Sequence, residues 1–148
     1  MNKKGFTILE ILVVLSVIAI LISVAVPRLK GMQDQANISK VKAELKAEQS
    51  SLESYYTNAS PNAYPATTTT LGTTLIAATP QILPSALTDP FAAAGTQYNY
   101  ILNGKFYSIW SVGTAGDGSI SAISSTTGAV TKAGTAGSVL CITNGSGC

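Results

Sequence analysis

A single carboxylate, Glu10, interrupts a run of apolar residues that extends from Phe6 to Val26. An acidic side chain at the centre of a membrane-spanning helix costs about 2.5–3.5 kcal/mol. Burying its charge unpaired among packed apolar helices costs more. The chemistry open to Glu10 is therefore an ion pair with a cationic group that is buried beside it, which would offset the desolvation and fix the position of the helix.

Few other residues suit catalysis or metal binding. The chain has no histidine, and its two cysteines, Cys141 and Cys148, are too few for a structural zinc site. There is no phosphate-binding loop, and no catalytic triad or pair of carboxylates stands out. The sequence therefore predicts a protein that is not an enzyme and has no cofactor.

Composition points to an exported structural protein. Of the 148 residues, 46% are hydrophobic and only 11% are charged, whereas a typical soluble domain has about 25% charged residues. Nine lysines and arginines against seven acidic residues give a net charge of +2, so we expect no nucleic-acid partner. Beyond Ser54 the charged residues are Asp89, Lys105, Asp117 and Lys132.

The apolar run is long enough to cross a bilayer as a helix, since about 21 residues at about 1.5 Å each span about 30 Å. Lys3 and Lys4 precede it and favour a cytoplasmic N-terminus. Three interpretations compete for it. It is a secretory signal peptide cleaved after Ala25, a plain transmembrane anchor, or the leader and assembly helix of a filament subunit.

The third interpretation depends on a family resemblance. The sequence KKGFTILE, followed by the apolar run, resembles the class III prepilin leader of type IV pilins and type II secretion major pseudopilins. The resemblance implies that a prepilin peptidase cleaves after Gly5, so that residues 1–5 form the leader, and then N-methylates Phe6. Glu10 of one subunit would then meet the new amine at Phe6 of a neighbour during assembly.

The resemblance also implies partners and a location. The partners are copies of the chain itself in a homopolymer, the prepilin peptidase, an assembly ATPase and a platform membrane protein. The precursor would lie in the bacterial inner membrane, and the mature chain in a cell-surface pilus or, as the alternative, a periplasmic pseudopilus. Removing Lys3 and Lys4 leaves seven positive and seven negative residues, so copies would not repel one another. A third alternative is a single-pass membrane-anchored extracellular binding protein, which is not cleaved at Gly5.

The expected fold class is α+β, and the resemblance implies a pilin fold. We predict one long helix from Thr7 to Tyr56, kinked at Pro27 because proline removes a backbone hydrogen bond. Residues 6–27 form its hydrophobic half, in the membrane or the filament core. Pro27 is therefore a candidate assembly residue, since filament subunits of this family often melt the helix before this proline.

Residues 28–57 form an amphipathic half of the same helix. Apolar residues recur at three-, four- and seven-residue intervals, which predicts a buried stripe: Ile38, Val41, Leu45, Leu52 and Tyr56. Charged residues are expected to cover the surface between them: Lys40, Lys42, Glu44, Lys46 and Glu48.

Beyond the helix, residues 58–96 contain five prolines and predict an irregular loop, with a short helix or strand at Leu71–Ala78. Residues 97–148 predict an antiparallel sheet of three or four strands, which packs on the amphipathic helix half. The expected strands are Gln97–Leu102, Lys105–Val112, Ser119–Ser124 and Ser138–Thr143, with a hairpin turn at Asn103-Gly104.

The sequence SVGTAGDG at residues 111–118 looks like that of the major pseudopilin, a family that holds calcium with acidic residues after this turn. Asp117 is the only acidic residue here, and calcium prefers six to eight oxygen ligands with several carboxylates. We therefore expect Asp117-Gly118 to form a turn and no metal to bind, with calcium as the open alternative.

Cys141 and Cys148 flank the short sequence ITNGSG, in which Asn144-Gly145 favours a turn. Two close cysteines usually oxidise outside the cytoplasm, and the spacing is not that of a C-x-x-C redox pair. The sequence therefore predicts a C-terminal disulfide. Many type IV pilins have such a bond and the usual major pseudopilin lacks it, which favours a pilus.

Overall fold

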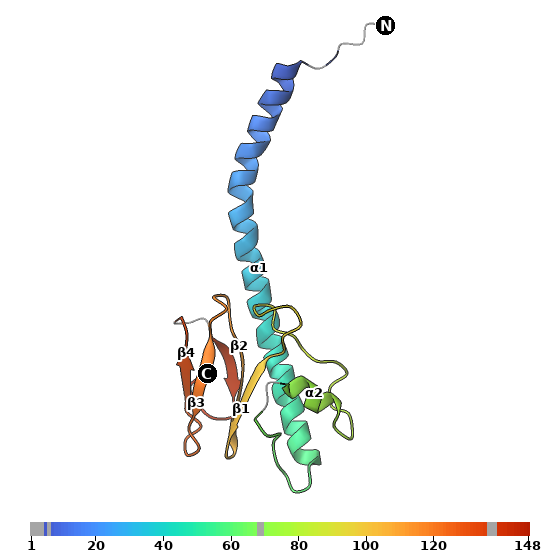
Figure 1. The fold of residues 1–148 in the computed structure, drawn as a ribbon, viewed down its shortest axis with the longest axis vertical. Helices are drawn as coiled ribbons and strands as arrows, with labels where there is room; N and C mark the ends of the chain where they lie inside the picture. Colours follow the sequence, from blue (N-terminus) through green and yellow to red (C-terminus); the bar gives the residue numbers. More distant parts are fainter. Residues whose placement is uncertain (1–4, 6, 68–69, 136–138) are drawn as a thin grey trace. The chain divides into compact units, whose positions relative to one another are not determined.

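The computed structural model describes residues 5, 7–67, 70–135 and 139–148, and it has the expected α+β architecture (Figure 1). The helices are α1 (Ile8–Asn58) and α2 (Leu71–Ile76). The strands are β1 (Asn99–Asn103), β2 (Phe106–Ser111), β3 (Ser119–Ile123), β4 (Val130–Ala133) and β5 (Leu140–Thr143). The chain divides into two compact units, residues 1–36 and residues 37–148, and α1 contributes to both.

The first unit contains the apolar half of α1. Thr7 caps the helix, because its Oγ1 atom accepts a hydrogen bond of 3.2 Å from the backbone N–H of Glu10. The helix is continuous through Pro27, so the proline does not interrupt it. Its expected role in assembly stays a prediction.

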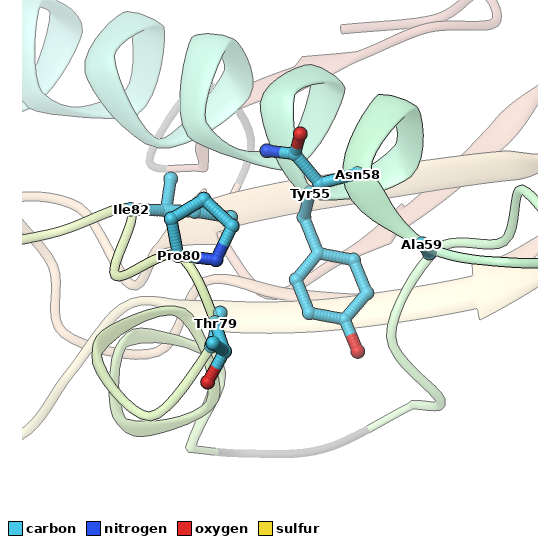
Figure 2. Close-up of a pocket in the computed structure, with 7 residues that line it drawn as sticks. Tyr55, Asn58, Ala59, Thr79, Pro80 and Ile82 are labelled. Atoms are coloured by element: carbon cyan, nitrogen blue, oxygen red, sulfur yellow. The ribbon is translucent and has the colours of Figure 1, made fainter.

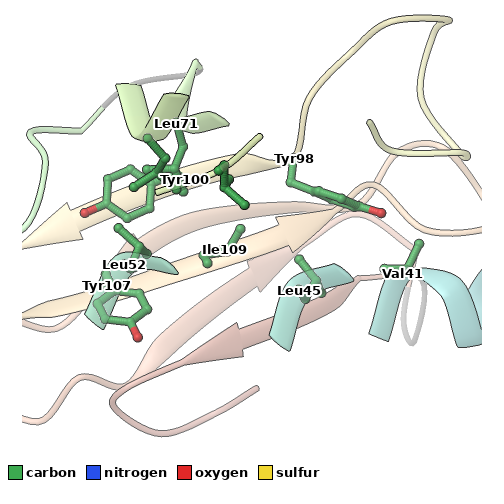
Figure 3. Close-up of a cluster of buried hydrophobic side chains, with 10 residues drawn as sticks. Val41, Leu45, Leu52, Leu71, Tyr98, Tyr100, Tyr107 and Ile109 are labelled. Carbon is green, nitrogen blue, oxygen red and sulfur yellow. The ribbon is translucent and has the colours of Figure 1, made fainter. Parts of the chain in front are cut away.

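The second unit has one hydrophobic core between the C-terminal half of α1, the short helix α2 and the strands β1 and β2 (Figure 3). Val41, Leu45 and Leu52 of the predicted stripe are buried, while Ile38 and Tyr56 at its ends are half-buried. The amphipathic helix half therefore packs on the sheet as expected. Helix α2 settles the open choice at residues 71–78, since Leu71 and Leu75 bury its inner face.

Strands β1, β2 and β5 form one antiparallel sheet with β2 in the centre. The connection between β1 and β2 consists of Gly104 and Lys105, one residue later than the predicted Asn-Gly pair. Gly104 has a φ of 63°. The first position of such a two-residue hairpin turn favours glycine, because a residue without a Cβ adopts a positive φ at little cost. Strand β5 confirms the last predicted strand, although its predicted first residue, Ser138, lies outside the described residues.

The prediction of a single sheet with three or four strands is wrong. The described residues contain five strands in two sheets, and β3 pairs only with β4 in a separate two-stranded sheet. Strand β4 has four residues, and three of them are exposed. So short a segment, with no buried face, lacks the alternation of apolar and polar residues by which a strand is recognised.

The expectation that Glu48 lies on the surface is also wrong. Its side chain is fully buried, and neither carboxylate oxygen has a hydrogen-bond partner among the described residues. Burial raises the pKa of Glu48 to about 8, and the nearby charge of Glu44 adds to this effect. The spacing accounts for the placement, because Val41, Leu45, Glu48 and Leu52 follow one another at intervals of four, three and four residues on one helix face.

The predicted disulfide between Cys141 and Cys148 is confirmed, with the two Cα atoms 5.3 Å apart. Replacing both cysteines by serine is expected to lower the free energy of unfolding by about 2 kcal/mol, because the bond restricts the unfolded chain. Urea unfolding of the two proteins would measure the difference. Adding a reductant to the wild-type protein should reproduce the effect, and equal stability with and without the bond would contradict the prediction.

Candidate functional site

The candidate site is the apolar surface of α1 in the first unit, which no other described part of that unit covers. Its large hydrophobic side chains, from Ile8 to Met32, are between 45% and 87% exposed. Soluble monomers rarely expose an apolar surface of this extent, and the helix is long and apolar enough to cross a membrane. Such a surface suits contact with lipid or with other apolar helices.

The two serines in this segment do not break its apolar surface. Ser16 Oγ donates a hydrogen bond of 2.7 Å to the backbone carbonyl of Val13, and Ser23 Oγ donates one of 2.7 Å to the carbonyl of Ile20. Each hydroxyl donor is thus satisfied within the helix, as a nonpolar environment requires. The segment can pack against lipid or helices without leaving these donors unpaired.

Glu10 is the acidic residue of the first turn of α1, and its side chain is exposed. The positive end of the helix dipole favours a carboxylate at this position. No ion pair with Glu10 occurs within residues 5, 7–67, 70–135 and 139–148. The pairing of Glu10 with a neighbour's amine stays a prediction.

Gly5 has no structural reason to be glycine in this fold. A Cβ atom built on Gly5 would meet no atom within 4 Å, and its φ is not in the left-handed region. Phe6, the predicted new N-terminus, lies outside the described residues. Packing among the described residues therefore does not require a glycine here, and the predicted cleavage after Gly5 stays a prediction.

Tyrosine–glutamate hydrogen bonds that the sequence did not reveal join α1 to the rest of the second unit. Tyr98 donates to Glu44 Oε2 at 2.5 Å, and Tyr107 and Tyr64 donate to Glu53 at 2.7 and 3.0 Å. Burial and the adjacent carboxylates raise the pKa of all three phenols, to about 12 for Tyr64. The phenols therefore remain donors at physiological pH.

A small pocket of about 140 Å³ lies beside the C-terminal end of α1, where the Tyr55 side chain extends toward the loop after α2 (Figure 2). Its lining offers a phenol, an amide and a hydroxyl but no carboxylate, amine or thiol: Tyr55, Asn58, Ala59, Ala78, Thr79, Pro80 and Ile82. This set of groups provides neither a nucleophile with a base nor an acid–base pair.

Asp117, the doubtful calcium ligand of the sequence analysis, lies against donors of the chain itself. Asp117 Oδ2 already accepts hydrogen bonds from the backbone N–H and the side-chain hydroxyl of Thr135, at 3.0 and 2.6 Å. Across the described residues, no group of three histidines, cysteines or acidic residues could hold a metal ion. Calcium needs several oxygen ligands that are free of competing donors.

Comparison with known proteins finds a family model that matches the N-terminal apolar segment. Residues 1–26 match the family described as the prokaryotic N-terminal methylation motif. The chain is 38% identical over 85 residues to the type II secretion system core protein G of Klebsiella michiganensis, covering 57% of each chain. It is 46% identical over 43 residues to the type IV narrow pilus major component PilA5 of Thermus thermophilus, covering 29% of this chain and 37% of that one.

A second core protein G, from Dickeya chrysanthemi, is 37% identical over 71 residues, which cover 48% of this chain and 45% of that protein. The matches to these three relatives thus span between 37% and 57% of the relatives' own length. No solved structure matches the chain. The chain thus matches an N-terminal methylation motif and is similar to type II secretion core proteins and a type IV pilus component, which agrees with the resemblance that the sequence indicates.

Proposed function

We propose that this chain is a structural subunit that polymerises into a type IV pilus or a pilus-like filament. Its leader, residues 1–5, would be removed and Phe6 N-methylated before assembly. The observation that carries the proposal is the exposed apolar surface of α1, from Ile8 to Met32, on a segment that matches the methylation motif. Such a helix suits lipid before assembly and neighbouring helices afterwards.

The same physical chemistry supports a homopolymer. Lipid tails and the apolar helices of other subunits are both suitable surroundings for this segment. A helix that leaves the membrane must exchange one for the other, since exposing it to water costs about 25 cal/mol for each Å² of apolar surface. An assembly ATPase and a platform membrane protein would supply the work of extraction, and a prepilin peptidase would cleave after Gly5.

We also propose that the chain is not an enzyme. The support comes from its relatives, whose names describe a pilus component and a core protein of a secretion system, and from a pocket lining without an acid–base pair. The precursor would reside in the inner membrane, and no nucleic acid or cofactor is required.

A periplasmic pseudopilus of a type II secretion system is the second candidate. It is favoured by the longest of the matches described above, to a core protein G over 85 residues. The C-terminal disulfide favours a surface pilus instead. Electron microscopy of filaments sheared from intact cells separates the two, because a pilus is recovered in the sheared fraction and a pseudopilus stays in the periplasm.

Mass spectrometry of the N-terminus of the mature protein tests the proposal. An N-methylated phenylalanine at position 6 would support a filament subunit. A chain that starts at Val26 would indicate ordinary secretion, and an intact Met1 would indicate a membrane-anchored extracellular protein. Purified surface material that is monomeric and retains residues 1–5 would overturn the proposal.

Replacing Glu10 by alanine is expected to leave membrane insertion intact and to reduce filament yield at least about tenfold, since an interaction with a buried charge contributes about 1.5–3 kcal/mol. Quantitative immunoblotting of membrane and sheared fractions measures both. The matched control is Asp34→Ala, which removes a carboxylate from the same helix beyond the apolar segment. Normal filament yield from the Glu10 variant would contradict the pairing of Glu10 with a neighbour's amine.

A further inference from the structure

We propose that a hydrogen-bonded tether between Asp117 and Thr135 holds the turn at residues 112–118 against the segment after β4. This tether takes the place of a calcium ion. The folded second unit would therefore not depend on calcium. This inference concerns the sheets alone and holds whether or not the chain forms filaments.

The tether joins two connections that run between the sheets of the second unit. Asp117 lies in the connection between β2 and β3, and Thr135 follows β4. One carboxylate oxygen, Asp117 Oδ2, accepts both the backbone N–H of Thr135 at 3.0 Å and its hydroxyl at 2.6 Å. Hydrogen bonds to a charged acceptor are about twice as strong as neutral ones, so this contact can hold the two segments together.

The segment after β4 also lies against the backbone of Asp117 and Gly118. A Cβ atom on Gly134 would lie 2.5 Å from the carbonyl oxygen of Asp117 and 3.1 Å from the Cα atom of Gly118. Gly134 also has a φ of 101°, which a residue with a side chain rarely adopts. The segment after β4 therefore lies directly against the turn, and glycine is what permits the approach.

Two backbone carbonyls of the turn already accept hydrogen bonds from the turn itself. The carbonyl of Val112 accepts the N–H of Gly118 at 3.0 Å, and the carbonyl of Gly113 accepts the N–H of Gly116 at 2.9 Å. A calcium ion attracts oxygens and repels the positive ends of N–H groups. The donors that converge on this turn therefore take the role that a cation would have.

A second carboxylate fixes the beginning of the turn in the same way. Asp89 is buried, and its Oδ1 atom accepts the hydroxyl of Ser111 at 2.8 Å and the N–H of Phe91 at 3.0 Å. Its Oδ2 atom accepts the N–H of Val112 at 2.9 Å. Both acidic residues near the turn are thus satisfied by donors of the chain rather than left as metal ligands.

Thermal unfolding of the full chain in detergent tests the proposal. The midpoint is expected to be the same in excess calcium chloride and in excess EGTA. Any rise of the midpoint with calcium would overturn the proposal, and Asp117→Asn would then show whether Asp117 is a ligand by abolishing the rise. Isothermal titration of the folded protein with calcium gives a second readout, and saturable binding that Asp117→Asn removes would also overturn the proposal.

Thr135→Val tests the tether itself. It is expected to lower the midpoint by about 2–8 °C, in EGTA and in calcium alike, because it removes one of the two hydrogen bonds. The matched control is Thr114→Val in the same turn, whose exposed hydroxyl has no hydrogen bond to any described residue. An unchanged midpoint in Thr135→Val, or a loss that calcium restores, would overturn the proposal.

Discussion

Replacing Glu48 by glutamine is expected to raise the free energy of unfolding by about 3 kcal/mol at pH 7, since each unit of pKa shift corresponds to about 1.4 kcal/mol. Glu48 is fully buried without a hydrogen-bond partner among the described residues. Its pKa in the folded chain is about 8 instead of 4.5. The folded protein therefore holds a proton at pH 7 that the unfolded chain releases.

The sign of the pH dependence follows from the raised pKa. Below pH 4.5 the carboxyl group is protonated in both states and costs nothing. As the pH rises from 4.5 to about 8, the unfolded chain ionises while the folded chain does not, so stability falls. Above about pH 8 both states are ionised and the loss is complete. Urea unfolding of the full chain in detergent at a series of pH values measures the slope.

The glutamine variant should lose most of this slope, because its side chain cannot ionise. Gln33→Ala is the matched control, since Gln33 lies on the same helix, is exposed and cannot ionise, and the slope of this variant should equal that of the wild type. The groups whose charge acts near Glu48 are Glu44, one helical turn away, and the phenol of Tyr98. A variant less stable than the wild type at pH 7 would show that Glu48 is paired in the folded protein.

Replacing Leu52 by alanine is expected to lower the free energy of unfolding of the second unit by about 2–5 kcal/mol. Leu52 is fully buried in the core between α1 and the strands (Figure 3). The substitution removes the apolar burial of the side chain and leaves a cavity in a close-packed interior. Urea unfolding followed by tyrosine fluorescence measures the loss, since Tyr98, Tyr100 and Tyr107 line the same core.

Leu21→Ala is the matched control for this prediction. Leu21 lies on the same helix and is 65% exposed, so its removal should change the unfolding of the second unit by no more than about 0.5 kcal/mol. The same variant should reduce filament yield if the apolar surface packs against other subunits. Equal losses of stability in the two variants would contradict the assignment of Leu52 to the core and Leu21 to an assembly surface.

Features encoded over short distances along the chain were predictable. The helix from Ile8 to Asn58 follows from its apolar run and helix-forming residues, and its observed bounds differ from the predicted ones by one and two residues. The disulfide between Cys141 and Cys148 was predictable because the two residues are only seven positions apart and because close cysteines usually oxidise outside the cytoplasm. The spacing from Gly5 to Glu10 is likewise a local pattern, which is why the sequence alone revealed the resemblance to prepilin leaders.

Features that depend on distant residues were not predictable in this way. The partner of Asp117 lies 18 residues further along the chain, and no local pattern connects an aspartate to a particular threonine. Glu48 was misassigned because a charged residue is normally exposed, although its position among Val41, Leu45 and Leu52 marks the buried face. Similarly, the separate β3–β4 sheet depends on which strand edges meet, and the strand propensities of single segments do not encode this.

The open surroundings of Gly5 have a consequence for how variation at this position should be interpreted. Since a Cβ atom here would meet no atom of the described residues within 4 Å, a larger residue is expected to leave the subunit's stability intact. Under the proposed function, the requirement for glycine would then come from the peptidase that cleaves after Gly5. Screens that score expression level or thermal tolerance would classify such variants as harmless, whereas cells that carry them would lack filaments.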